Sequence, residues 1–155
     1  VQDVSSLSEA RDVLSGNAPE GIVASLVVQS GQVQAGDTIT VHVVLEASKP
    51  GIGAFTMDLY HDPNLLTAVS CDSNPAGLCN AQFEQRVSRF TFSTATPLVG
   101  AIEVGSVTFQ TAVGAKGPSS LDAIVLTLSD PYGRDLQAGQ IRNGVIEVIP
   151  RGNPD

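Results

Sequence analysis

The chain has 155 residues and a mass of 16.0 kDa, which suits one domain with a core of its own. Eight Lys and Arg face sixteen Asp and Glu, so the net charge is -8 and the pI is about 4.5. We therefore expect neither nucleic acid nor an anionic membrane surface as a partner, because both require basic patches. Hydrophobic residues make up 42% of the chain and charged residues 15%, which argues against disorder. No apolar run is long enough to insert into a membrane.

The two cysteines, Cys71 and Cys79, lie eight positions apart and enclose a segment of turn-forming residues. We expect a disulfide across this loop, which points to an oxidising, extracellular or cell-surface setting. The alternatives are two free thiols or half of a metal site, for which only His42 and His61 are available as further soft ligands. The chain begins at Val1 with no signal peptide, as a mature or excised module would.

Residues 5–14 are predicted to form a short helix. Ser6 and Glu9 have the spacing of a capping box, and Gly16 ends the pattern. The apolar face consists of Leu7, Ala10, Val13 and Leu14. An isolated helix of this length is marginal, so it needs a surface on which to dock. We take residues 1–20 as an N-terminal extension, 21–150 as the folded domain and 151–155 as the start of a linker.

From residue 22 onward, apolar and polar residues alternate in short runs separated by turn signals. We predict strands at residues 22–28, 38–46, 53–61, 65–71, 86–95, 101–112, 121–128 and 144–149. The alternation changes phase within 101–112, which predicts a bulge near Gly105-Ser106. Eight or nine strands without intervening helices predict an all-β fold, an antiparallel β-sandwich or jelly roll with one satellite helix.

The same alternation separates core-facing from outward side chains. We expect Phe55, Met57, Leu59, Phe90, Phe92 and Phe109 to point inward, and residues 121–128 to carry Ile124, Leu126 and Leu128 on one side. On the opposite parity, the outward set is Ala54, Thr56, Asp58, Tyr60, Arg89 and Thr91.

Several segments together resemble the cohesin family. They are GDTITVHVVLEA, then GIGAFTMDLYHDPNLLTAVS, then VGSVTFQTAV and the closing NGVIEVIP. The most specific element is Gly51–Leu66, where a Gly-x-Gly-aromatic strand start precedes a His-Asp-Pro-x-x-Leu turn. The resemblance covers residues 22–149 and implies a nine-stranded jelly roll without an active site. Carbohydrate-binding modules with related jelly rolls belong to the same superfamily.

The resemblance also implies a partner, because cohesins of cellulosomes bind a calcium-loaded dockerin on one flat sheet face. Type I members carry an Asn and an Asp at the positions of Ala54 and Thr56. We therefore take the outward residues around this strand as the partner-binding strip, namely Thr56, Asp58, Tyr60, Arg89 and Thr91. The acidic net charge favours a partner with a basic contact patch.

Residue patterns for catalysis are missing from the sequence. Asp58 and Asp62 would lie about 13 Å apart on an extended strand, too far for paired carboxylates in a retaining or inverting glycosidase. Glu103 and Glu147 occupy outward strand positions, and no G-x-S-x-G motif occurs. We expect both histidines to be surface side chains and the protein not to be an enzyme.

We expect no cofactor and no metal site, with calcium as the one ion that the sequence leaves open. Asp72-x-Asn74 opens like half of an EF-hand loop, but later ligand positions hold Ala76 and Phe83. Asp130–Asp135 is a second Asp-rich turn, which ordinary turn chemistry explains.

The function indicated by the sequence is therefore a non-catalytic extracellular binding module that recruits a dockerin-like protein in a polysaccharide-degrading or cell-surface assembly. One alternative is a carbohydrate-binding module, for which Tyr60 and Tyr132 would be the sugar platforms. The chain lacks Trp, and its aromatic residues total only 5%. The other alternative is a structural or adhesive sandwich domain that spaces neighbouring modules.

Overall fold

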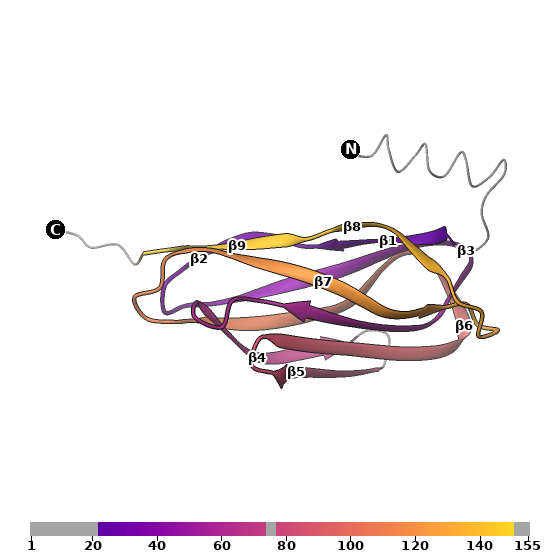
Figure 1. The fold of residues 1–155 in the computed structure, drawn as a ribbon, viewed down its shortest axis with the longest axis horizontal. Helices are drawn as coiled ribbons and strands as arrows, with labels where there is room; N and C mark the ends of the chain where they lie inside the picture. Colours follow the sequence, from indigo (N-terminus) through magenta and orange to yellow (C-terminus); the bar gives the residue numbers. More distant parts are fainter. Residues whose placement is uncertain (1–21, 74–76, 151–155) are drawn as a thin grey trace.

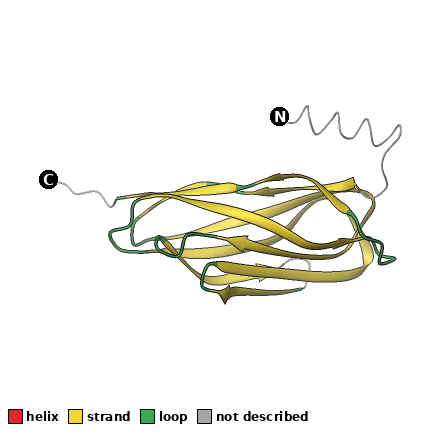
Figure 2. Ribbon diagram, in the orientation of Figure 1, coloured by secondary structure: helices red, strands yellow, loops and turns green. Residues whose placement is uncertain are grey.

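Strands account for most of the computed structural model, which describes residues 22–73 and 77–150 (Figures 1 and 2). No helix occurs in these two ranges, so the all-β prediction is confirmed for them. The described residues therefore contain no helix long and apolar enough to cross a membrane. The helix predicted at residues 5–14, the linker at 151–155 and residues 74–76 lie outside the described part of the chain.

Nine strands are formed by the described residues. They are β1 (Ile22–Val28), β2 (Gly31–Gln34), β3 (Thr38–Tyr60), β4 (Leu66–Ser73), β5 (Leu78–Glu84), β6 (Val87–Thr111), β7 (Gly117–Ser129), β8 (Gln137–Arg142) and β9 (Gly144–Ile149). This set differs from the predicted one. The breaks predicted near Pro50-Gly51 and between residues 95 and 101 are wrong, because β3 and β6 each run through. Strands β2, β5 and β8 were not predicted. The expectation of an antiparallel fold is also wrong at two pairs, because β8 runs parallel to β1 and β2 runs parallel to β9.

The two long strands allow one sheet to curl into two layers. The first half of β3 pairs with the second half of β6, from Thr38↔Gln110 to Ala47↔Gly100. The other two halves pair from Ala54↔Ser93 to Tyr60↔Val87. We call the first layer the β1 layer; it contains β8, β1, the first half of β3, the second half of β6, and β4. The β7 layer contains β2, β9, β7, the second half of β3, the first half of β6, and β5.

The core lies between these layers and contains the side chains that alternation assigned to it. Phe55, Met57, Leu59, Phe90 and Phe109 are at most 1% exposed, and Phe92 is also buried. The Phe55 and Phe92 rings lie 5.5 Å apart, centre to centre. Burial of large apolar side chains of this kind is the main stabilising term in such a fold.

The bulge predicted in β6 is present, at Val104. Val43 pairs with Gly105 and Val44 pairs with Glu103, so Val104 is the extra residue. Gly105 does not supply an unusual backbone conformation at the bulge, because its φ angle is not positive. A Cβ atom there would lie 2.6 Å from the Phe90 ring, so glycine is needed for close packing against the opposite half of β6.

The two glycines of the Gly-x-Gly segment of β3 are required for different structural reasons. Gly51 adopts φ of 97°, which favours glycine, where β3 crosses from one layer to the other. Gly53 instead contacts the turn after β7, since a Cβ atom there would lie 2.6 Å from Pro131 Cα. This contact fixes the start of the second half of β3.

The predicted disulfide is confirmed: Cys71 of β4 is bonded to Cys79 of β5, with Cα atoms 6.1 Å apart. Both cysteines are therefore excluded as free thiols or metal ligands. The bond ties β5 to β4. Since β4 pairs with the second half of β6 and β5 with the first half, the bond also links the two layers at their edge.

Candidate functional site

The outer surface of the β7 layer brings together all five residues of the predicted strip. Across this layer the strands follow the order β7, β3, β6, β5. We call the outward side chains of these four strands the β7-layer face. Its central members are Thr56, Asp58 and Tyr60 on β3 and Arg89 and Thr91 on β6.

Strand register places four of these residues in direct pairs. Thr56 lies opposite Thr91, with their hydroxyl oxygens 2.8 Å apart. Asp58 lies opposite Arg89, which donates two hydrogen bonds, from Nε to Oδ1 at 2.6 Å and from Nη2 to Oδ2 at 2.7 Å. Tyr60 lies two residues further along β3, between its partners Val87 on β6 and Asp122 on β7.

The Asp58–Arg89 ion pair forms the charge-balanced centre of this face. The side chain of Asp58 is only 7% exposed, whereas that of Arg89 is 34% exposed. The guanidinium carbon of Arg89 also lies 3.9 Å from the centre of the Phe83 ring. The hydrogen bonds to Asp58 raise the pKa of Arg89 above its ordinary value. A partner would thus meet the guanidinium, while Asp58 positions it from below.

Exposed apolar side chains flank this centre on both sides. On β5 lie Leu78, 75% exposed, and Phe83, 40% exposed. On β7 lie Ile124, 48% exposed, and Leu126, 50% exposed. Sequence reasoning missed all four of these residues as surface features.

The exposure of β7 has a local cause in its register. Asp58 pairs with Ile124 and Met57 with Val125, but Thr56 pairs with Thr127, so Leu126 is an extra residue. This bulge reverses the parity, and Leu128 is therefore buried while Ile124 and Leu126 are exposed. The expectation that Ile124, Leu126 and Leu128 share one side is wrong for this reason.

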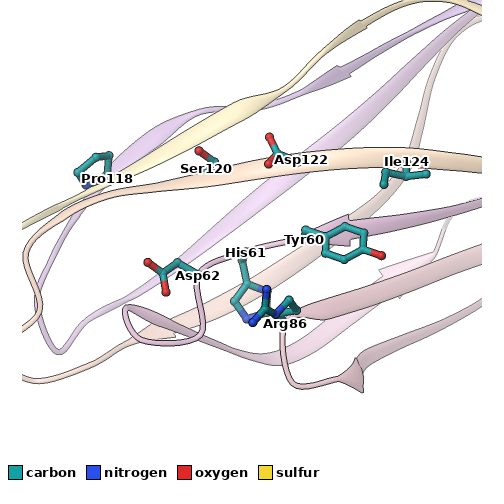
Figure 3. Close-up of a pocket in the computed structure, with 8 residues that line it drawn as sticks. All are labelled: Tyr60, His61, Asp62, Arg86, Pro118, Ser120, Asp122 and Ile124. Carbon is teal, nitrogen blue, oxygen red and sulfur yellow. The ribbon is translucent and has the colours of Figure 1, made fainter.

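An open cleft of about 490 Å³ lies at the end of the face where β3 finishes (Figure 3). Tyr60, His61 and Asp62 line one side, Arg86 lies beside the His61 ring, and Ser120 and Asp122 of β7 lie across from them. Two carboxylates, Asp62 and Asp122, and one guanidinium, Arg86, line the cleft, so it carries charges of both signs.

His61 is buried, contrary to the expectation of a surface histidine. The residue is 5% exposed, and its ring meets the Phe109 ring edge-on with centres 5.0 Å apart. Neither ring nitrogen has a hydrogen-bond partner among the described residues. Burial lowers the pKa of His61, Arg86 lowers it further, and Asp62 acts in the opposite direction. His61 has the same parity as buried Leu59, and this parity is the sequence feature that could have predicted its inward position.

The two tyrosines of the carbohydrate alternative lie far apart. Tyr60 ends β3, whereas Tyr132 is in the turn that follows β7, next to Gly53 and Ala54. Six residues of extended strand separate these ends, or about 20 Å. Tyr132 is 80% exposed, with the Arg134 guanidinium 5.6 Å from its ring centre. The structure therefore does not bring Tyr60 and Tyr132 into one platform.

The second Asp-rich turn is organised by its own hydrogen bonds. Asp130 is 2% exposed; Oδ1 accepts the backbone N–H groups of Tyr132 and Arg134, and Oδ2 accepts Arg134 Nε at 2.6 Å. Burial alone would raise the pKa of Asp130, but these hydrogen bonds outweigh it and lower the pKa. Within residues 22–73 and 77–150, no group of three or more His, Cys, Asp or Glu side chains is placed to hold a metal.

His42 lies where sequence analysis placed it, on the outer side of the β1 layer. Its Nδ1 is 3.0 Å from Glu103 Oε2, and both side chains are nearly half exposed. The two histidines thus occupy different layers and do not meet.

Comparison with known proteins agrees with this architecture. A family model for the cohesin domain matches residues 24–128, more than half of the chain. None of the curated protein sequences matches significantly. Among solved structures, the non-cellulosomal cohesin from the archaeon Archaeoglobus fulgidus has a TM-score of 0.70 at 17% identity, covering 82% of this chain and 91% of that one. A type I cohesin of OlpC from Clostridium thermocellum, solved in complex with a dockerin, has a TM-score of 0.75 at 16% identity. That match covers 86% of this chain and 99% of that one.

Fold and site together define a β-sandwich module of two layers, with an ion pair and exposed apolar side chains on the outer side of the β7 layer. The chain belongs to the cohesin domain family.

Proposed function

We propose that this protein is a non-catalytic adaptor that binds a dockerin-like protein through its β7-layer face. Membership of the cohesin family supports the proposal. Several of the similar structures are described as cohesin–dockerin complexes, including that of OlpC and the sixth cohesin of scaffoldin B from Acetivibrio cellulolyticus with a Cel5 dockerin.

The observation that carries the proposal is the composition of the face. Its centre is a hydrogen-bonded ion pair, Asp58–Arg89, and its flanks are exposed apolar side chains on β5 and β7. Binding energy in protein interfaces concentrates in aromatic and Arg anchors near the centre of the patch, and Arg89 with the Phe83 ring beside it is such a pair. A fully hydrogen-bonded pair also avoids the penalty of an unpaired buried charge. A stable interface needs about 800 Å² from each partner, which one sheet face can supply.

We further propose an extracellular or cell-surface location, within a polysaccharide-degrading or other surface assembly. The Cys71–Cys79 disulfide supports this, since such bonds persist in oxidising compartments. The assembly need not be a cellulosome, since one of the similar structures is described as a non-cellulosomal cohesin.

The test is affinity capture of secreted proteins from the source organism on the immobilised module in calcium buffer. Dockerins fold around calcium, so we expect EDTA to release a protein with a duplicated calcium-loop segment. The matched control is EDTA already saturated with calcium, which should release nothing. Equal release by both solutions would contradict the proposal, as would retention of the module on insoluble polysaccharide with no protein partner captured.

A further inference from the structure

The outer side of the β1 layer carries a groove that the proposed partner face does not use. Its volume is about 230 Å³, and strands β1, β3, β6 and β8 form its walls. In Figure 1, β1 and β8 lie side by side along the upper edge of the molecule. We call this hollow the β1 groove; its lining includes Ser25, Val27, Val44, Ala101, Gln140 and Arg142.

The floor of the β1 groove is apolar and the rim is charged. Val27 and Val44 are direct cross-strand partners, and Val27 remains 43% exposed. Glu46 lies at the rim on β3 and Arg142 on β8. The groove is thus an apolar binding surface between the carboxylate of Glu46 and the guanidinium of Arg142.

The N-terminal part of the chain contains a segment whose apolar and charged residues could complement this binding surface. Residues 5–14 carry the sequence pattern of a helix, about 15 Å long, with an apolar face formed by Leu7, Ala10, Val13 and Leu14. Beside that face the segment carries Glu9, Arg11 and Asp12. These charges complement those on the rim, since acidic residues can meet Arg142 and Arg11 can meet Glu46.

Chain length allows this segment to reach the groove. β1 begins at Ile22, and Val27 lies five residues further along the same strand, or about 17 Å. Residues 15–21 can span up to about 23 Å, which is enough for the chain to reverse direction over β1. Because a ten-residue helix is marginal alone, packing of its apolar face would supply most of its stability.

We propose that residues 5–14 form a helix that docks in the β1 groove of the same chain, with its apolar face on Val27 and Val44. The docked helix fills the β1 groove and leaves the β7-layer face free. The proposal does not depend on the identity of the partner.

Limited trypsin digestion of the full chain tests the docking, because Arg11 lies inside the segment. Cleavage at a transiently opened site follows the population of the open form. We expect Val27→Asp to accelerate cleavage after Arg11 by about tenfold or more relative to wild type, the effect of roughly 1.4 kcal/mol of lost docking energy. The matched control is Val145→Asp on β9, a residue 41% exposed on the other layer, which should not change the rate. Circular dichroism verifies that both variants keep the β-fold.

A second pair of variants in the segment keeps the proposal testable if Val27→Asp fails to fold. Leu7→Asp removes part of the apolar face and should accelerate cleavage after Arg11 and shift the NMR methyl signals of Val27 and Val44. Ser8→Asp changes the opposite side of the predicted helix and should do neither. Equal cleavage in wild type, Val27→Asp and Leu7→Asp would overturn the proposal. Protection that rises with protein concentration would also overturn it, because the occupant would then be a second copy.

Discussion

Arg89 of β6 and Asp58 of β3 face each other across paired strands and share two hydrogen bonds, of 2.6 and 2.7 Å. The centre of the Phe83 ring lies 3.9 Å from the guanidinium carbon, so the arginine contacts both a carboxylate and an aromatic ring. The unequal exposure of the two partners leads to the first prediction.

Removing the arginine should destabilise the protein more than removing the aspartate. Arg89→Ala leaves the carboxylate of Asp58 buried without its partner, which we expect to cost about 2 kcal/mol. Asp58→Ala leaves a guanidinium that water can reach and should cost about 1 kcal/mol. Urea unfolding at pH 7 measures both variants. An equal or reversed order would contradict the role assigned to Asp58.

Stability should depend on pH through His61. Burial lowers the pKa of His61, so the unfolded chain binds its proton at higher pH than the folded chain does. The free energy of unfolding should therefore fall as pH drops below about 6.5, the ordinary value for histidine, and this group should add no slope above that pH. Urea midpoints at pH 7.5, 6.5 and 5.5 measure the slope. His61→Gln should flatten it relative to wild type. A slope in His61→Gln equal to that of wild type would count against this explanation.

The disulfide should stabilise the edge of the sandwich. Replacing Cys71 and Cys79 together by Ala should lower the free energy of unfolding by about 2.5 kcal/mol, as expected for so short a closed loop. Hydrogen exchange should increase first in β5, which otherwise pairs only with β6. A loss below about 1 kcal/mol, with β5 still protected, would show that strand pairing alone holds this edge.

Gly53→Ala should be destabilising even though the change is small. The added Cβ would lie 2.6 Å from Pro131 Cα and 2.8 Å from the Asp130 carbonyl carbon, and these backbone atoms cannot rotate away. We expect a loss of about 1–3 kcal/mol, the usual range for overpacking. Thermal unfolding measures it. An unchanged midpoint would mean that the turn after β7 moves freely relative to β3.

Much of the fold and of the strip could be predicted because alternation is strong in the central strands. On β3, inward Phe55, Met57 and Leu59 leave Thr56 and Asp58 outward without ambiguity. Their pairing with Thr91 and Arg89 follows from inter-strand register, which the sequence of one strand does not specify.

The missed elements have weak patterns for physical reasons. β5 and β8 are edge strands. β5 has no buried position, since each of its residues is intermediate or exposed, and β8 carries Ile141 as its one large apolar residue, so neither sequence has a strong strand pattern. The bulge at Leu126 shifts parity by one residue, and this turned a predicted apolar side of β7 into exposed side chains on the face. The burial of His61 differs from the expectation because the inward parity of Leu59 on β3 continues one residue beyond the strand, up to the turn that starts at Asp62.

The most direct test of the proposed partner face is the affinity of the captured calcium-loaded partner for two matched variants. Ile124→Asp places a charge on the face beside Asp58, and Val69→Asp makes the same change on β4 in the other layer. The two side chains are 48% and 51% exposed, so neither change disturbs the core. Titration calorimetry should show at least about 30-fold weaker binding for Ile124→Asp, as for loss of an interface anchor, and unchanged binding for Val69→Asp. Wild-type affinity in Ile124→Asp together with weakened binding in Val69→Asp would place the partner on the β1 layer and contradict the account.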